Sequence, residues 1–216
     1  GIRTTHAVLF VCLQLGGDPP EHPRISPRAK LEAWVDASQE TAKLIRRGAE
    51  AVIEALEAQY RALHRELSVR RHNEATIDDA RAALQQMRRK AGPGNRMLVH
   101  YNGHGMPSIT ANGELWFFDA RREHFVPCNI IDFAAFAQSP TVYVIDCNNA
   151  ASVINMWRQS VDPQQRESSR DVFLCACGED QVLPTNPALP ADFFTACLTT
   201  PLRAALLWYA QYSDRQ

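Results

Sequence analysis

Apolar and polar positions follow two patterns that alternate along this chain. Apolar runs that predict buried strands lie at residues 6–15, 97–101, 141–145 and 171–177, and residues 66–70 predict a more exposed strand. Amphipathic segments that predict helices lie between them, at residues 29–35, 38–64, 76–92, 130–137, 151–161 and 191–212. Such alternation predicts an α/β domain, a three-layer sandwich with a mostly parallel central sheet and helices on both faces.

Turn-forming residues mark the segments outside this alternation. Residues 16–27 hold two glycines and four prolines and predict an irregular loop, residues 162–170 predict a polar loop, and residues 178–190 a proline-bearing loop. Asn112-Gly113 is a hairpin signal, with a first strand up to Asp119 and a returning strand at residues 125–127. The last helical segment is expected to break near Thr200-Pro201.

Composition narrows the class of protein. A chain of 216 residues, 45% of them hydrophobic and 22% charged, suits one soluble globular domain over residues 1–216. The net charge of -1 argues against nucleic acid as a partner, and the basic clusters at residues 88–90 and 70–71 are interpreted as solvated helix ends or loops. No apolar run approaches the roughly 18 residues that a membrane span needs.

The six cysteines indicate reduced thiols. They are spread over the chain, several of them inside apolar runs, which is typical of a cytoplasmic protein and not of a disulfide framework. Cys175 and Cys177 would share one face of a strand, but no second Cys/His pair lies at metal-ligand spacing. We therefore expect no metal site and no cofactor.

Two predicted strands end in residues that could carry chemistry. The strand at 97–101 runs into Asn-Gly-His-Gly at residues 102–105, and the strand at 141–145 into Asp-Cys-Asn-Asn at residues 146–149. Open α/β sheets place their sites at the carboxyl ends of parallel strands, so His104 and Cys147 are expected to meet at one edge. Cysteine with histidine is a nucleophile–base pair.

The register of the second strand argues against this nucleophile–base pair. Side chains alternate between the faces of a strand, so Cys147 shares a face with Tyr143 and Ile145, and Asn148 is the first residue to project over the edge. A strand-end protease needs its nucleophile at the projecting position, and asparagine has no ionisable nucleophile there. Asp146 is a candidate to hydrogen-bond the Gly-His-Gly turn, and His100 is interpreted as a core histidine.

These motifs resemble those of two related families. Residues 101–105 resemble the Tyr-Ser-Gly-His-Gly of metacaspases, and residues 145–150 resemble their Asp-Cys-Cys-His-Ser-Gly. The catalytic histidine of that family falls on His104 and its catalytic cysteine on Asn148, with Cys147 one residue earlier. A closer resemblance is to the N-terminal conserved, caspase-like domain of the Raptor family, the regulatory-associated proteins of the TOR kinase. Its motifs lie at residues 18–20, 31–36, 100–105, 112–116, 139–140, 143–150 and 189–201.

The Raptor resemblance implies a caspase-like domain without established peptidase activity. Family members carry serine where this chain has Asn148, and they continue into a helical-repeat solenoid and a WD-repeat propeller that 216 residues cannot hold. The chain is therefore expected to be one domain of a longer scaffold. The partners implied are the TOR kinase and substrates that bear a TOR-signalling motif.

Two functional hypotheses follow. In the first, the chain is a non-catalytic scaffold or adaptor domain of TOR complex 1, with His104, Cys147 and Asn148 as a vestigial site. Residues 112–127, with aromatics at 116–118, and residues 178–190 could then bind a partner, although packing of the hairpin on its own domain is an equal alternative. In the second, Cys147 and His104 form an active cysteine peptidase of the caspase or metacaspase type.

Overall fold

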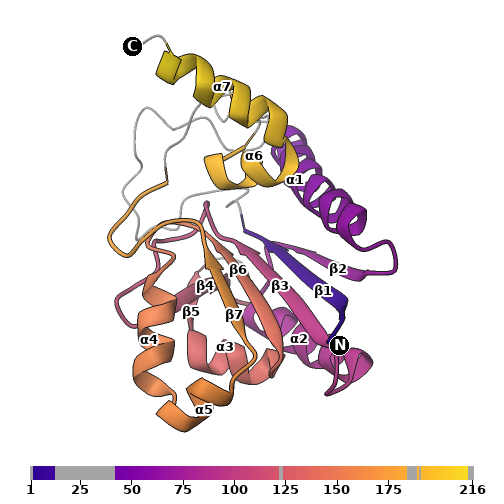
Figure 1. Ribbon diagram of the computed structural model, residues 1–216, viewed down its shortest axis with the longest axis vertical. Helices are drawn as coiled ribbons and strands as arrows, with labels where there is room; N and C mark the ends of the chain where they lie inside the picture. Colours follow the sequence, from indigo (N-terminus) through magenta and orange to yellow (C-terminus); the bar gives the residue numbers. More distant parts are fainter. Residues whose placement is uncertain (1, 13–41, 122–123, 184–188, 190, 214–216) are drawn as a thin grey trace.

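A five-stranded parallel sheet forms the centre of the molecule (Figure 1). The structure is a computed structural model that describes residues 2–12, 42–121, 124–183, 189 and 191–213. The strand order is β2-β1-β3-β6-β7, with β1 at Thr4–Val11, β2 at Ser68–Asn73, β3 at Arg96–Asn102, β6 at Thr141–Asp146 and β7 at Val172–Cys175. The predicted α/β sandwich with a parallel central sheet is confirmed.

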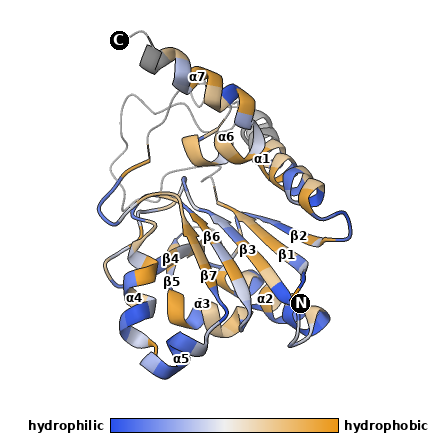
Figure 2. Ribbon diagram, viewed as in Figure 1, coloured by the Kyte–Doolittle hydropathy of each residue, from blue (hydrophilic) through white to orange (hydrophobic). Residues whose placement is uncertain are grey.

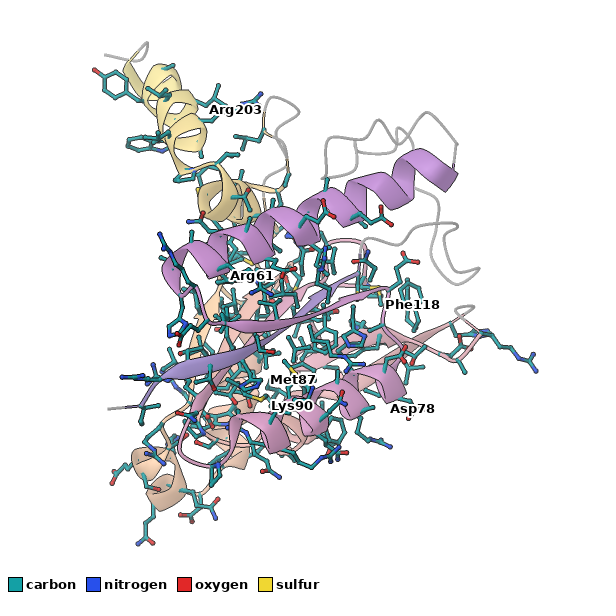
Figure 3. All side chains as sticks on the ribbon, turned by 90° about the vertical axis from the view of Figure 1, so that its right-hand side faces the viewer. Arg61, Asp78, Met87, Lys90, Phe118 and Arg203 are labelled. Carbon is teal, nitrogen blue, oxygen red and sulfur yellow. The ribbon has the colours of Figure 1, made fainter. Side chains whose placement is uncertain are left out.

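Helices cover both faces of this sheet. One face carries α1 at Ala42–Leu63 and α6 at Phe193–Thr199, and α6 leads into α7 at Pro201–Ser213. The other face carries α2 at Ile77–Ala91, α3 at Ile130–Ala137 and α4 at Ser152–Ser160. Figure 3 shows the two layers edge-on, with Arg61 on α1 above the sheet and Met87 and Asp78 on α2 below it. In the described part of the chain, none of the helices has the length and apolar character to cross a membrane.

The inner strands are buried because both of their faces are covered. All five residues from Ala7 to Val11 are fully buried, as the unbroken apolar run predicts. Ala7, Leu9 and Val11 pack with α1, while Val8 and Phe10 pack into the larger cluster with α2 and α3. Figure 2 shows apolar colour along β1 and alternating stripes on the helices.

Helix α1 follows its predicted stripe except at its end. Val52, Ile53, Leu56 and Tyr60 are buried against the sheet, as expected. Leu63 continues the same apolar spacing but is 76% exposed, because it is the last residue of the helix. The loop predicted at 16–27 and the helix predicted at 29–35 lie outside the described residues.

Helix α2 begins where its sequence predicts, but near its end Arg88 is buried, which the sequence did not predict. Thr76 and Asp79 form a reciprocal capping box at its start. Arg88 does not belong to a solvated basic cluster, because only 5% of it is exposed. Its guanidinium donates hydrogen bonds to backbone carbonyls of Asn95, Ala137, Gln138 and Pro140. One cation thus fastens α2 to the connection that leads into β6.

The predicted hairpin forms and packs on its own domain. Strand β4 at Glu114–Phe118 pairs antiparallel with β5 at Phe125–Asn129. The Asn112-Gly113 signal lies before the hairpin and not in its turn. Phe117 and Phe118 are buried in the core, and Trp116 is half-buried with its indole N–H bonded to the Ser108 carbonyl. The hairpin therefore packs on its own domain, and its aromatic residues do not form an exposed anchor for a partner.

Two expectations near the end of the chain were wrong. Residues 163–168 form a helix, α5 at Pro163–Ser168, and not a loop, because the Asp162 carboxylate caps it and Pro163 occupies its first turn. Strand β7 was expected to be buried, but it is an edge strand, and Val172 and Leu174 are each 46% exposed. A run of four apolar residues cannot by itself distinguish an edge strand from a central one. The break between α6 and α7 at Thr200-Pro201 is as predicted.

Candidate functional site

The two strand ends singled out by the sequence lie next to each other. Strands β3 and β6 are parallel neighbours, with Asn102 paired to Asp146 at their carboxyl ends. The backbone N–H of Gly103 donates to the Asp146 carbonyl at 2.9 Å, which fastens the turn to β6. A Cβ at Gly103 would lie 2.4 Å from the Tyr101 ring, so only glycine allows the chain to turn here.

His104 is held by a carboxylate at this edge. Its Nε2 lies 2.7 Å from Asp146 Oδ1, and its side chain is only 4% exposed. Because a carboxylate only accepts, this contact is an N–H···O bond from Nε2 in which Asp146 orients the imidazole. Asp146 thus bonds the Gly-His-Gly turn twice, through its side chain and through its carbonyl.

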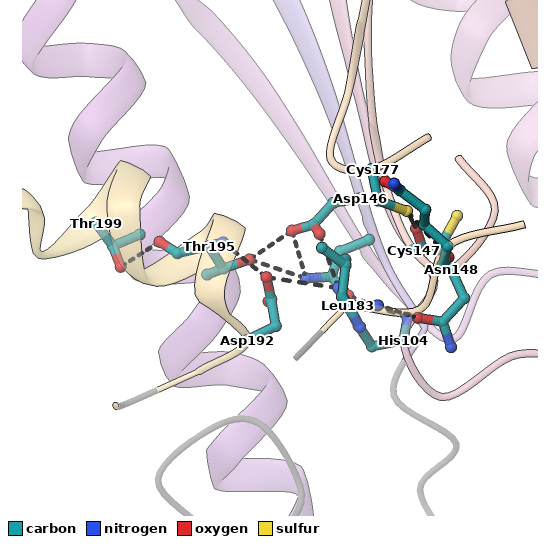
Figure 4. A network of polar contacts seen from close by, with 11 residues as sticks. His104, Asp146, Cys147, Asn148, Cys177, Leu183, Asp192, Thr195 and Thr199 are labelled. Carbon is teal, nitrogen blue, oxygen red and sulfur yellow. Dashed lines mark hydrogen bonds and ion pairs between the residues drawn. The ribbon is translucent and has the colours of Figure 1, made fainter. Parts of the chain in front are cut away.

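Helix α6 completes the network from the other side of the carboxylate (Figure 4). The Thr195 hydroxyl donates to Asp146 Oδ2 at 2.7 Å, and the Asn102 amide donates to the Thr195 oxygen at 3.1 Å. Asp192 Oδ1 accepts from the Thr195 backbone N–H at 2.8 Å and lies 3.5 Å from His104 Nε2. Asp192 has a raised pKa, because burial and the nearby Asp146 carboxylate both disfavour its charge.

Sequence reasoning missed Asp192 and Thr195. A signal for them exists in Asp192-Phe-Phe-Thr195, where an aspartate stands three residues before a threonine at a helix start. A helix that follows a parallel strand begins near the carboxyl edge of the sheet, which is where the site lies. The segment follows a long proline-bearing loop, so its sequence position alone does not reveal this proximity.

Cys147 lies at the same edge of the sheet as His104 but on the opposite face. It packs in the apolar cluster that also holds Tyr143 and Ile145, on the face opposite α6. Burial, and then the charge of Asp146, raise the pKa of the Cys147 thiol well above its ordinary value. The expectation that His104 and Cys147 meet is therefore wrong, because successive residues of β6 point to opposite faces.

Asn148 leaves the strand as its register predicts. Its side-chain Oδ1 accepts from the Leu183 backbone N–H at 2.9 Å, and its carbonyl accepts from the Ile109 N–H at 3.3 Å. The next residue, Asn149, has φ +57° and bonds the carbonyl of Ile109 through its amide. Asn148 and Asn149 thus join two loops by hydrogen bonds.

His100 is a core histidine, as predicted. It is fully buried, and its Nδ1 pairs with the Tyr60 hydroxyl at 2.8 Å. Burial lowers its pKa to about 4, so the ring is neutral at pH 7. His100 and His104 both serve the face that α1 and α6 cover.

The residues that can act chemically are therefore an imidazole and two carboxylates. All six cysteines are free thiols, and Cys147, the one predicted at the site, lies on the face opposite His104. His104, Asp146 and Asp192 place one potential metal-ligand atom each within 4.8 Å of one another. The sequence predicted no metal site and did not include Asp192.

Known proteins resemble this chain in sequence and in fold. Residues 2–157 match the family described as the Raptor N-terminal CASPase like domain. The target of rapamycin complex 1 subunit mip1 of Schizosaccharomyces pombe is 33% identical over 96% of this chain, which spans 17% of that protein. Regulatory-associated protein of TOR 1 of Arabidopsis thaliana is 35% identical over 98% of this chain, which spans 16% of it.

A solved structure of a related protein has the same fold. The crystal structure of Chaetomium thermophilum Raptor superposes with a TM-score of 0.79 at 34% identity, covering 98% of this chain and 18% of that one. Fold, motif order and sequence identity thus agree over nearly the whole of the 216 residues. The chain belongs to the family of Raptor N-terminal caspase-like domains.

Proposed function

We propose that this domain is a non-catalytic scaffold domain of TOR complex 1 that helps to present substrates to the TOR kinase. Relatives that match almost the whole chain bear the names of TOR complex 1 subunits, among them mip1 and KOG1 of Saccharomyces cerevisiae. The chain spans 17% and 14% of these two proteins, so the kinase and substrates with a TOR-signalling motif are proposed as partners of the longer protein.

The observation that carries the proposal is the placement of Asn148. The position of the family nucleophile holds an amide whose oxygen is bonded to the Leu183 N–H. An amide cannot form the covalent intermediate that a cysteine peptidase needs. The polar network around His104 supports a structural role for the old site, since Asp146 and Thr195 connect the sheet edge to α6.

The rival function, a peptidase using Cys147, has weak geometric support. The thiolate is the reactive form of cysteine, and the raised pKa keeps Cys147 protonated at neutral pH. His104 Nε2 is bonded to Asp146 on the other face of the sheet. A shift of the reacting atoms by about 1 Å already costs on the order of 100-fold in rate, so a nucleophile on the wrong face is a large obstacle.

Reconstitution of the complex tests the scaffold proposal. The full-length protein that contains this domain, and a variant that lacks it, are each assembled with the TOR kinase. Two substrate peptides, with and without a TOR-signalling motif, are then phosphorylated. Because docking raises the local substrate concentration, we expect deletion to slow phosphorylation of the motif-bearing peptide by roughly tenfold or more and to leave the other unchanged. Equal loss of both rates, or none, would reject the proposal.

A second assay tests the peptidase. The 216-residue chain is incubated with a fluorogenic peptide library, beside the variants Cys147→Ala and His104→Ala. We expect no turnover from any of the three. Turnover that both substitutions abolish would overturn the non-catalytic assignment. The variant Asn148→Cys places a thiol at the family position, and we expect it to react with a thiol probe without gaining turnover.

A further inference from the structure

The network around His104 carries an imbalance of charge. The side chains of Asp146 and Asp192 are fully buried, and one imidazole separates them. Neither carboxylate forms an ion pair with a lysine or arginine among the residues that the structure describes. Two carboxylates and a neutral imidazole sum to a formal charge of −2, which is costly to bury without a cation or protons.

One oxygen in this cluster also has no partner. Within the part of the chain that the structure describes, Asp192 Oδ2 is buried and accepts no hydrogen bond, whereas Oδ1 of the same carboxylate accepts from the Thr195 N–H. Buried carboxylate oxygens almost always have a donor or a cation, because leaving one unpaired costs about 1–3 kcal/mol or more. The unpaired oxygen belongs to the same carboxylate that lies 3.5 Å from His104 Nε2.

We propose that His104, Asp146 and Asp192 bind one zinc ion. Their ligand atoms lie within 4.8 Å of one another, with carboxylate oxygens 2.7 and 3.5 Å from His104 Nε2. Tetrahedral zinc with ligand bonds of about 2.0–2.1 Å separates its ligand atoms by about 3.3 Å. The two separations from His104 Nε2 bracket this value, and side-chain rotations that draw the two carboxylates together from within 4.8 Å complete the site.

The ligand types select the metal. Zinc takes imidazole nitrogen together with carboxylate oxygen, whereas magnesium and calcium are held by oxygen atoms alone. Three protein ligands leave a fourth position for water. On binding, neutral His104 carries its proton on Nδ1 and presents the lone pair of Nε2, and the cation takes the place of the hydrogen bond between His104 and Asp146.

The surrounding hydrogen bonds already orient the proposed ligands. Thr195 donates its hydroxyl to Asp146 Oδ2 and its backbone N–H to Asp192 Oδ1. Such outer contacts fix carboxylate ligands at metal sites. The ion would connect the turn after β3, the end of β6 and the start of α6, so it stabilises the fold. This role goes beyond the proposed scaffold function and does not depend on it.

Zinc titration of the 216-residue chain tests the site. After chelator treatment, zinc alone is added and followed by calorimetry and by thermal unfolding, with cobalt as a spectroscopic probe. We expect one ion per chain, a higher unfolding temperature, and a cobalt spectrum without the intense near-ultraviolet bands of thiolate ligands. Cys177→Ser tests binding by the neighbouring thiols of Cys175 and Cys177, and we expect it to leave the affinity unchanged.

The decisive variant is Asp192→Asn, which keeps an oxygen to accept from Thr195 and removes the ligand charge. We expect its zinc affinity to fall at least about 10-fold, as for His104→Gln. The matched control Asp162→Asn changes a helix cap far from the site and should bind as the parent does. Metal-free circular dichroism checks that each variant is folded. Absence of zinc binding by the folded parent, or unchanged affinity in both folded ligand variants, overturns the proposal.

Discussion

The two faces of the sheet at the ends of β3 and β6 differ in chemistry. Toward α2 and α3 the core is aromatic, and the rings of Phe10, Phe117 and Phe133 lie 5.7 to 6.1 Å apart. Toward α1 and α6 the same strands bury His100 and Asp146 in polar contacts. Because of this difference, a shift of one residue along β6 is enough to separate the Cys147 thiol from the His104 imidazole.

This separation follows from the period of two along β6. Asp146 faces the polar side and Cys147 the apolar side, although they are neighbours in sequence. The same alternation that gives His104 a carboxylate partner keeps the cysteine away from it.

The largest effect is expected on the aromatic face, from Phe133→Ala. Phe133 is fully buried and contacts the rings of Phe10, Phe117 and Tyr143. Its truncation leaves a cavity, so the free energy of unfolding should fall by about 3–5 kcal/mol. Denaturant unfolding at pH 7 measures this loss. The control Phe133→Leu should lose clearly less, and equal losses would mean that the ring packs poorly.

Much of the fold could be predicted because its signals are local. The unbroken apolar run of β1 predicted a strand covered on both faces, and Thr76 predicted the start of α2. What could not be predicted depends on distant partners. The burial of Arg88 requires carbonyls from residues 137–140, about fifty positions later in the chain.

The site could be predicted only as far as its two strand ends. His104 and Asp146 follow from the strand motifs, and the register of Asn148 follows from alternation. Asp192 and Thr195 come from a helix that no strand motif points to, and the sequence does not give the path of the preceding loop. The face of His104 was also open, because a turn residue is not bound by strand alternation.

The second prediction concerns pH and the polar face. The pKa of His100 is lowered to about 4 in the folded chain, against 6.5 when it is unfolded. The unfolded chain therefore takes up the proton first, and stability that is fully present above pH 6.5 is lost as the pH falls toward 4. The loss amounts to roughly 3 kcal/mol. Urea unfolding at pH 7 and pH 4.5 measures most of it.

Other groups around His100 titrate as well, so the comparison needs a variant. Tyr60 from α1, Asp192 from α6 and His104 from the turn all face this ring. The raised pKa of Asp192 acts in the opposite direction, since its folded form takes up a proton more readily. In His100→Gln we expect the acid-dependent loss to shrink. An unchanged pH profile would show that His100 does not govern it.

The third prediction removes one hydroxyl from the polar network. Thr195→Val keeps the shape of the side chain but leaves Asp146 Oδ2 with only the 3.4 Å hydrogen bond from the Asn102 amide. Losing the strong donor of a buried carboxylate costs about 1–3 kcal/mol of unfolding free energy. Thr199→Val is the matched control on the same helix, since the Thr199 hydroxyl only bonds a backbone carbonyl one turn earlier. Equal effects from the two substitutions would contradict a special role for Thr195.

The smallest effect is expected at Asn148, where the two faces meet at the sheet edge. Asn148→Ala removes the acceptor for the Leu183 N–H, and Asn148→Asp keeps an oxygen in its place. We expect alanine to cost about 1 kcal/mol, and hydrogen exchange at the Leu183 amide to become faster. With aspartate the amide should stay protected. If alanine leaves this exchange unchanged, the hydrogen bond does not hold the loop, and Asn148 has no structural role at the sheet edge.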